Sequence, residues 1–147
     1  MDQQIKRKTI WLLCIGLIIL IGVIAGAIYL FNTIFPKAAP INLPQTEDIV
    51  SASLSDSDSD QTVPLRDEDM EQLLQYLSEG KPTRQTAMND SPTERTYYGI
   101  SVQTDVREYR YFIYKKGEQI YVEVPYEGIY EAQMELFDLV CTYYQET

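Results

Sequence analysis

The chain has 147 residues, 12 of them basic and 22 acidic, and it contains no histidine. From residue 41 onward there are 8 basic and 21 acidic residues, a difference of −13. Such a surface repels phosphate groups, so we expect no nucleic-acid partner. The lack of histidine removes the commonest general base and the commonest metal ligand, and we therefore expect no catalytic residue, no metal site and no cofactor.

An uncharged apolar stretch of 22 residues runs from residue 10 to residue 31. As a helix it would be roughly 33 Å long, enough to cross a hydrocarbon core of about 30 Å. Lys6, Arg7 and Lys8 precede it, and this placement predicts that residues 1–9 form a cytoplasmic tail. We predict a single-pass signal-anchor protein of the cell membrane, in contact with the lipid bilayer, with an extracytoplasmic C-terminal domain. A signal peptide cleaved near 25–27 is the alternative, because Ala-Gly-Ala there has small residues at cleavage spacing.

Two glycines within this stretch, Gly22 and Gly26, form a GxxxG pair. Small residues at this spacing let two membrane helices approach closely. A homodimer packed through these glycines is one interpretation. The simpler interpretation is that these glycines mediate no dimer.

Residues 32–64 are predicted to be a disordered acidic linker. The segment holds four prolines and, at 51–60, a run in which Ser alternates first with Ala and Leu and then with Asp. With few large apolar residues, burial cannot offset the entropy lost on ordering. We expect an extended spacer.

Residues 65–147 are predicted to form one small α+β domain, in which a helix, a three-stranded antiparallel meander and a second helix follow in order. Apolar residues recur at helical spacing near both ends, while Tyr, Ile and Val alternate in the middle between short turn segments. The expected helices are 67–79 and 129–144, the expected strands are 96–103, 107–115 and 118–124, and 81–95 is expected to be a loop.

Two-residue turns at 104–105 and 116–117 would set the strand register. They pair Tyr98 with Tyr111 and Ile113 with Ile120, so that both hairpins place one apolar set on a common face. The predicted core face consists of Tyr98, Ile100, Val102, Tyr109, Tyr111, Ile113, Ile120, Val122 and Val124.

The same registers place a row of aromatic residues, Tyr97, Phe112 and Tyr121, across the opposite face, with Arg110 opposite Glu123. A helix packed over the row would make it part of the interior. Left exposed, the row would be a platform for a partner.

The segment YFIYKKGEQIYVEVPYEGIY at residues 111–130 resembles the signature of an uncharacterised family of small extracytoplasmic domains from Gram-positive bacteria, domain of unknown function 5301. The resemblance covers residues 65–145. It implies a bacterial surface location and no assigned activity.

The sequence favours a binding or accessory module that contacts another envelope or membrane protein, because tyrosine combines an apolar ring with a hydrogen-bonding tip. Two alternatives stay open: a wall hydrolase that uses Glu123 and Glu127 as a carboxylate pair, and an immunity-type protein against a secreted peptide. The candidate partner-binding residues are Tyr97, Phe112, Tyr121, Tyr126 and Tyr130.

Overall fold

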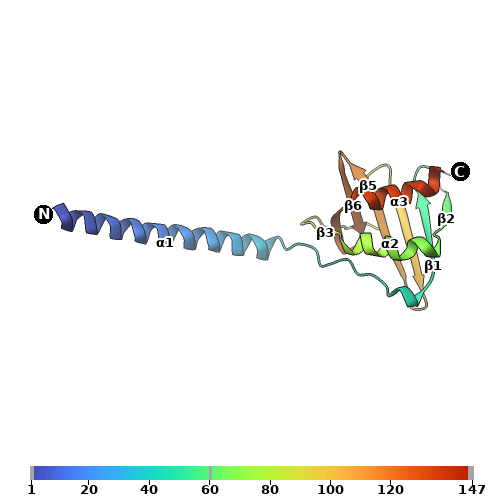
Figure 1. Ribbon diagram of the computed structural model, residues 1–147, viewed down its shortest axis with the longest axis horizontal. Coiled ribbons are helices and arrows are strands. Elements are labelled where there is room, and N and C mark those ends of the chain that lie inside the picture. The colour runs from blue at the N-terminus through green and yellow to red at the C-terminus, as the bar shows by residue number, and fades with distance from the viewer. Residues whose placement is uncertain (1, 60, 146–147) are drawn as a thin grey trace. The chain divides into compact units, whose positions relative to one another are not determined.

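The computed structural model describes residues 2–59 and 61–145, and it divides the chain into two units, 1–36 and 37–147 (Figure 1). Residue 60 of the predicted linker, residues 146–147 of the predicted domain and Met1 of the predicted tail lie outside the described residues. The first unit is the helix α1 (Asp2–Ile34). Its segment Lys8–Ile34 is long and apolar enough to span a membrane, although a signal sequence near an N-terminus has the same properties.

The second unit is an α+β domain built on a seven-stranded antiparallel sheet, not on the three-stranded meander predicted above. The strand order is β2-β1-β4-β5-β6-β7-β3, and every pairing is antiparallel. Its elements are a 3₁₀ turn η1 (Thr46–Asp48), β1 (Ile49–Asp56), β2 (Thr62–Pro64), α2 (Asp67–Ser78), β3 (Lys81–Pro82), β4 (Tyr98–Thr104), β5 (Glu108–Lys116), β6 (Gln119–Val124), β7 (Gly128–Ala132) and α3 (Met134–Gln145).

Two of the additional strands, β1 and β2, lie in the segment predicted to be a disordered linker, and that prediction is wrong for them. β1 pairs with β4 along most of its length, and Leu54 lies opposite Ile100 with no exposed surface. Ala52 lies on the same face, whereas Ser53 and Ser55 alternate onto the other. Because Ile49, Ala52 and Leu54 are the apolar residues of β1 that contact the core, and serine dominates the rest, the composition of this strand resembles that of a polar spacer.

The strand β7 replaces the first turn of the predicted C-terminal helix. Residues 128–132 pair with β6, with Tyr130 opposite Val122, and α3 begins only at Met134. Ile129, Ala132 and Leu136 have helical spacing, but the edge of β6 offers main-chain hydrogen bonds that a helix starting at 129 would leave unmade.

Both hairpins are shifted by two residues from the predicted registers. Tyr98 pairs with Ile113 rather than Tyr111, and Ile113 pairs with Val122 rather than Ile120. The second turn is centred on 117–118, where Gly117 has a φ of 64° that other residues rarely adopt. Because side chains alternate with a period of two, a shift of two leaves each residue on its predicted face.

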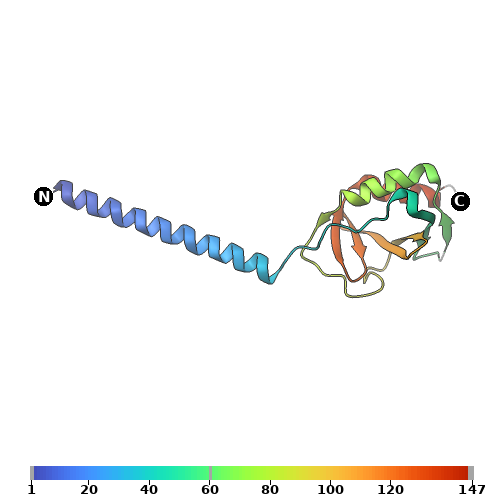
Figure 2. The ribbon, with the colours of Figure 1, turned by 90° about the horizontal axis from the view of Figure 1, so that it is seen from below.

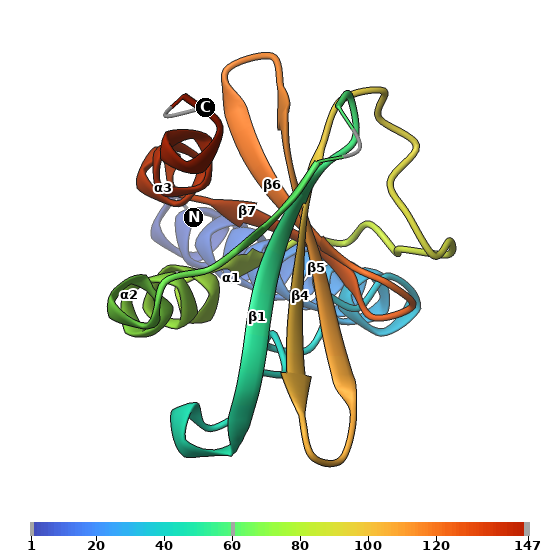
Figure 3. The same ribbon diagram turned by 90° about the vertical axis from the view of Figure 1, so that its right-hand side faces the viewer.

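The predicted core face is therefore confirmed, and both helices of the second unit pack against it. Figure 3 shows α2 and α3 on the same side of the sheet. Leu73 and Leu77 of α2 and Leu136 and Val140 of α3 are fully buried there. Seven of the nine predicted core residues are buried, while Tyr98 and Tyr109 are partly buried and pack against them.

The segment before β1, residues 37–48, which we call the arm, is docked on the domain rather than free. The hydroxyl of Tyr130 donates to the carbonyl of Ala39 at 2.7 Å, and the hydroxyl of Tyr111 donates to the carbonyl of Asn42 at 2.8 Å. A β-carbon on Gly128 would come within 2.5 Å of the Ala38 methyl, so close approach of the arm requires glycine there. Figure 2 shows the arm running from the end of α1 toward β1.

The loop between β3 and β4, residues 83–97, lies on the side of the sheet away from the helices (Figure 3). Ala87 and Pro92 are buried within it. Lys116 forms an ion pair with Glu94 at 2.8 Å. The second face of the sheet is thus partly covered by this loop, and by no helix in the described part of the domain.

Membership of β1 in the sheet predicts that Leu54→Ala destabilises the domain by about 2–5 kcal/mol, the cost of emptying a buried leucine site. Urea unfolding of the full chain in detergent, followed by circular dichroism, measures the change. Val50→Ala is the control, because Val50 is in the same strand and 63% exposed. If the two variants changed the free energy of unfolding equally, residues 49–56 would be a linker and not a strand of the sheet.

Candidate functional site

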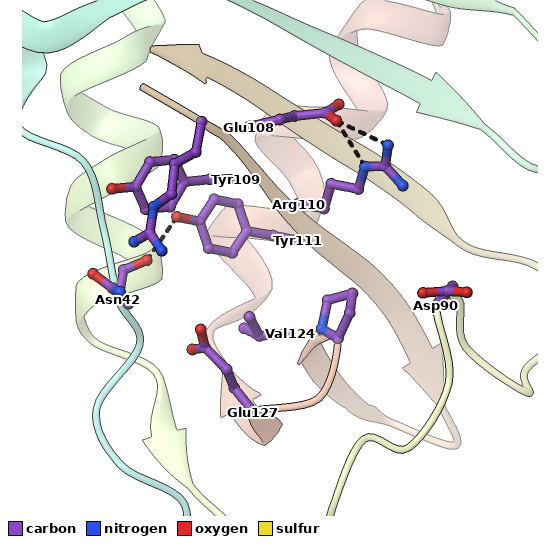
Figure 4. A pocket seen from close by; sticks show the side chains of 10 residues that line it. Asn42, Asp90, Glu108, Tyr109, Arg110, Tyr111, Val124 and Glu127 are labelled. Atoms are coloured by element: carbon purple, nitrogen blue, oxygen red, sulfur yellow. Dashed lines mark hydrogen bonds and ion pairs between the residues drawn. The ribbon is translucent and has the colours of Figure 1, made fainter. Parts of the chain in front are cut away.

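A cavity of about 290 Å³ lies between the first half of β5 and the turn that joins β6 to β7 (Figure 4). The arm contributes Asn42 to its wall, and the 83–97 loop contributes Asp90. Segments far apart in sequence therefore meet here. The lining residues are Asn42, Asp90, Arg107, Glu108, Tyr109, Arg110, Tyr111, Val124, Pro125 and Glu127.

The β6–β7 turn at this cavity holds a strained residue. The N–H of Glu127 donates to the carbonyl of Val124 at 3.0 Å, and Tyr126, the third residue of that turn, has a φ of 62°. Proline followed by a residue of positive φ is the type II pattern, in which glycine or asparagine normally takes the third position. A tyrosine there costs of order 1–3 kcal/mol, and such strain clusters at functional sites.

The side chain of Tyr126 is exposed to solvent rather than packed in the core. It is 67% exposed, and its hydroxyl donates to Asp90 at 2.8 Å. That hydrogen bond raises the pKa of Tyr126, with a smaller contribution from burial. The bond ties the turn to the 83–97 loop and holds an aromatic ring beside the cavity.

The cavity wall carries both signs of charge. The Arg107 guanidinium lies 4.1 Å from the centre of the Tyr109 ring, a cation–π contact. Glu108 pairs with Arg110 at 2.8 Å and also accepts a hydrogen bond from Ser101. These partners lower the pKa of Glu108.

The cavity floor contains the Tyr111 hydroxyl. Burial raises the pKa of Tyr111, Glu127 raises it further, and Arg107 opposes the rise. The hydroxyl is therefore a neutral donor to the arm, and it is subject to the charges of both Glu127 and Arg107. A site of this kind can hold a polar group by hydrogen bonds and opposite charges, with aromatic walls for apolar contact.

The predicted aromatic row does not form as one row. Tyr97 and Phe112 make an edge-to-face pair at 5.4 Å, whereas Tyr121 stacks on Tyr114 at 5.8 Å. The two-residue register shift places Phe112 opposite Glu123 and Tyr121 opposite Tyr114. Tyr97, Phe112 and Tyr121 are half-buried, on the face that the 83–97 loop partly covers.

Tyr126 and Tyr130 were predicted as partner contacts, and the structure separates them. Tyr126 is exposed between Pro125 and Glu127, two residues that line the cavity, whereas Tyr130 is fully buried and bonded to the arm. The prediction of a surface role for Tyr130 is therefore wrong. It placed residue 130 at the start of a helix, where β7 instead directs the side chain into the core.

The predicted pairing of Arg110 with Glu123 is also wrong, because Arg110 pairs with Glu108 on its own strand. Glu123 is 6% exposed, and the Tyr114 hydroxyl donates a hydrogen bond to it. Burial raises the pKa of Glu123 above its ordinary value, the Tyr114 hydrogen bond opposes the rise, and nearby Glu94 adds to it.

The carboxylate pair considered for hydrolysis is not gathered at one cavity. Glu127 lines the cavity in Figure 4, but Glu123 is not among its lining residues. Within residues 2–59 and 61–145, no group of three or more His, Cys, Asp or Glu side chains is arranged to hold a metal ion. On α1, Gly22 and Gly26 leave open space where a β-carbon would lie.

Sequence reasoning missed the cavity itself, and above all the roles of Arg107, Tyr109, Asn42 and Asp90. The arm and the loop reach this point through tertiary contacts that have no local pattern. One local signal was present: the Pro-Tyr-x-Gly sequence at 125–128 places tyrosine where a type II turn favours glycine.

The architecture defines a small α+β domain that follows an apolar N-terminal helix. The chain belongs to the family DUF5301, described as Domain of unknown function (DUF5300), which matches residues 37–131. The match begins with the arm rather than at residue 65, so the arm, β1 and β2 are part of the family's domain. The family resemblance predicted from residues 111–130 is thereby confirmed.

One solved structure with the same fold is an NMR structure of a protein from Ruminococcus gnavus, at 24% sequence identity and a TM-score of 0.54. The similarity covers 63% of this chain and 91% of that one. At this identity the likeness extends to the fold alone. No curated protein matches the chain.

The buried carboxyl of Glu123 leads to a pH prediction. Because its pKa is raised on folding, the folded protein binds more protons than the unfolded chain between the ordinary glutamate pKa and the raised one. Stability from this group therefore falls as pH rises through that interval. Glu123→Gln keeps an acceptor for the Tyr114 hydroxyl and should raise the melting temperature at neutral pH.

The gain should shrink as pH falls below the ordinary glutamate pKa. Thermal unfolding of the full chain at a series of pH values measures it. Glu127→Gln is the matched control, because Glu127 is exposed and should change little. A gain for Glu123→Gln that does not depend on pH would show that titration of this carboxyl is not the cause.

Proposed function

We propose that this protein is a single-pass membrane protein whose C-terminal domain, outside the cytoplasm, binds a segment of another envelope or membrane protein at the cavity beside Tyr126. The observation that carries the proposal is the strained Tyr126. The fold keeps a tyrosine at a φ of 62°, and its ring is exposed and tied to Asp90 at the rim of a cavity. Folding gains little from such a residue, so a contact made by the ring accounts for it better.

The cavity suits a protein segment better than a small substrate. At about 290 Å³ it is at the lower limit of the roughly 300–1,000 Å³ typical of pockets for small ligands. Its wall combines tyrosine and arginine, which are enriched at the centres of protein interfaces. The excess of acidic residues disfavours nucleic acid, and we propose none as a partner.

Anchoring is supported by α1, whose segment Lys8–Ile34 could span a membrane, and by the basic residues 6–8 before its apolar part. The positive-inside rule then places the N-terminus in the cytoplasm. A Gram-positive cell surface is part of the proposal and follows the family resemblance. A homodimer through Gly22 and Gly26 would be compatible with it, because both positions leave room for a second helix.

The binding proposal predicts site-specific cross-linking. The full chain is expressed in the cells that naturally produce it, with p-benzoylphenylalanine in place of Tyr126. Irradiation of these cells should give one discrete adduct. The same group in place of Glu135, an exposed residue of α3, is the control and should give none. Adding Asp90→Lys should reduce the Tyr126 adduct by about tenfold, since it reverses an acidic charge at the cavity.

Loss of the adduct at position 126, or equal adducts at positions 126 and 135, would contradict a binding site at the cavity. Circular dichroism of the Asp90→Lys chain shows whether the domain is folded. Identification of the adduct by mass spectrometry then separates an envelope protein from a secreted peptide, the expectation of the immunity alternative.

The topology proposal predicts labelling from one side of the membrane. Glu135→Cys should react with a membrane-impermeant maleimide in intact cells, whereas Gln3→Cys should react only after lysis. Both are compared in a Cys14→Ala, Cys141→Ala background. A released chain that has lost the residue-3 label would show cleavage after a signal sequence. Labelling of Gln3→Cys in intact cells would show that the N-terminus lies outside the cytoplasm, opposite to the proposed topology.

A further inference from the structure

The strand β5 is longer than the strand beside it, and this leaves an unpaired edge at the cavity. The β5–β6 ladder ends at the pair formed by Phe112 and Glu123. β5 itself begins at Glu108 and continues to pair with β4 on its other side. Residues 108–111 thus have a paired strand on one side only.

The main-chain groups on this edge can be assigned from the hydrogen-bond pattern. The N–H of Thr104 donates to the carbonyl of Arg107 at 3.0 Å. Bonding alternates along an antiparallel pair, so Tyr109 and Tyr111 also bond to β4, whereas Glu108 and Arg110 direct their N–H and C=O groups the other way. In the described part of the chain, no main-chain hydrogen bond reaches Glu108 or Arg110 from that side.

Pro125 is the reason that β6 stops here. Continued pairing would place residue 125 opposite Arg110, and proline has no N–H to donate to the Arg110 carbonyl. The chain turns away instead through Tyr126. The space left beside β5 is the cavity lined by Arg110, Val124 and Pro125.

The side chains leave this edge clear. Glu108 and Arg110 pair with each other at 2.8 Å on one face of β5, and Tyr109 and Tyr111 lie on the other face (Figure 4). The unpaired N–H and C=O groups point between these two sets. The cavity lies along this edge, with Glu108 and Arg110 among its lining residues.

The other strand edges of the sheet are blocked in the ways that proteins use to prevent pairing. β2 is three residues long and ends in Pro64, and β3 is two residues long and consists of Lys81 and Pro82. The part of β1 not covered by β2 carries an irregularity between Ile49 and Ser51. The edge at Glu108 and Arg110 has neither a proline nor a bulge.

We propose that the unpaired edge of β5 at Glu108–Tyr111 accepts an extended, positively charged peptide segment of a partner as an added strand. Main-chain hydrogen bonds to Glu108 and Arg110 would supply affinity, and the residue between them would place its side chain in the cavity against Tyr109 and Tyr111. The proposal rests on the proposed binding function and names the class of partner.

The charge of the segment follows from the domain. With 21 acidic and 8 basic residues from position 41 onward, the domain attracts a basic segment and repels an acidic one. At the cavity the acidic lining residues Asp90, Glu108 and Glu127 outnumber the basic ones, Arg107 and Arg110, and favour the same sign. A second copy of this acidic chain is disfavoured on the same ground.

Amide exchange in the wild-type full chain, in nanodiscs of zwitterionic lipid, tests the proposal by NMR. The probe is a pool of seven-residue peptides with lysine at the second and sixth positions and β-branched or hydroxyl residues elsewhere. In the free protein the Arg110 amide should exchange quickly and the Tyr109 amide slowly. With the pool, exchange at Glu108 and Arg110 should slow by about tenfold or more, the gain expected from new main-chain hydrogen bonds.

Two control pools have defined outcomes. The same peptides N-methylated at alternate residues cannot pair as a strand, and peptides with glutamate in place of lysine have the opposite charge. Neither should slow these amides. No slowing with the basic pool at millimolar concentration, or equal slowing with the N-methylated pool, would overturn the proposal.

A pair of variants separates main chain from side chain. Arg110→Pro removes the unpaired N–H but none of the bonds to β4, whereas Arg110→Ala removes the side chain and keeps the N–H. Binding of the basic pool should weaken by about tenfold in Arg110→Pro and by less than about threefold in Arg110→Ala. Equal weakening would assign the binding to the side chain and overturn strand addition.

The cross-linking experiment distinguishes this failure from failure of the proposed function. If Arg110→Pro retains the Tyr126 adduct, a partner binds at the cavity without adding a strand, and only the present proposal is overturned. If the basic pool slows exchange of the β5 amides but no adduct forms at Tyr126, the edge accepts a peptide. The proposal that another protein binds at the cavity is then contradicted.

Discussion

The missing N–H of Pro125 is the constraint on which the architecture of the candidate site depends. It ends β6 after Val124, because the next ladder bond to β5 cannot form. It also presets the second position of a turn, which brings Tyr126 to a φ of 62°. The unpaired stretch of β5, the displayed ring and the cavity between them have one origin. A residue with an N–H at 125 would allow β6 to continue and close that space.

The arm depends on a second pair of interactions, the hydroxyls of the two buried tyrosines. Tyr111 and Tyr130 have almost no exposed surface, and a buried hydroxyl needs a partner. Both find one in arm carbonyls, those of Asn42 and Ala39. The arm therefore completes the core, and this explains why the family match begins at residue 37. The cavity depends on the same contacts, since Asn42 forms part of its wall.

The sequence predicted which face of the sheet a residue lies on better than it predicted which residue lies opposite it on the next strand. Alternation in 96–124 identified the core residues of β4, β5 and β6, because alternation survives a register error of two. It could not identify which residues lie opposite each other, so the Arg110–Glu123 pair and the single aromatic row were wrong. β1 was missed because Ser51, Ser53 and Ser55 occupy its second face and leave only Ala52 and Leu54 to indicate a strand.

Of the candidate site, the sequence singled out Tyr126 as a partner contact and Glu127 only as one of a carboxylate pair. The signal for Tyr126 was local, in a proline turn, whereas Arg107, Asn42 and Asp90 reach the cavity through contacts distant in sequence. Tyr130 shows the opposite case. It has the composition of an interface residue, but whether a tyrosine near a turn faces solvent or core depends on β7, which pairs with a strand outside its own segment.

The larger extent of the domain bears on how it can tolerate a strained residue. A domain of residues 65–147 alone would have a small core and little stability to spare. The arm and β1 add Leu54 to the fully buried set and pack Ile41, Leu43 and Ala52 against it. A strained turn persists only when its surroundings over-determine its conformation. At Tyr126 they do so from three directions: β6 and β7 fix both ends of the turn, Asp90 holds the hydroxyl, and the arm packs behind Gly128. The segment that composition assigned to a linker thus helps to hold the turn that displays Tyr126.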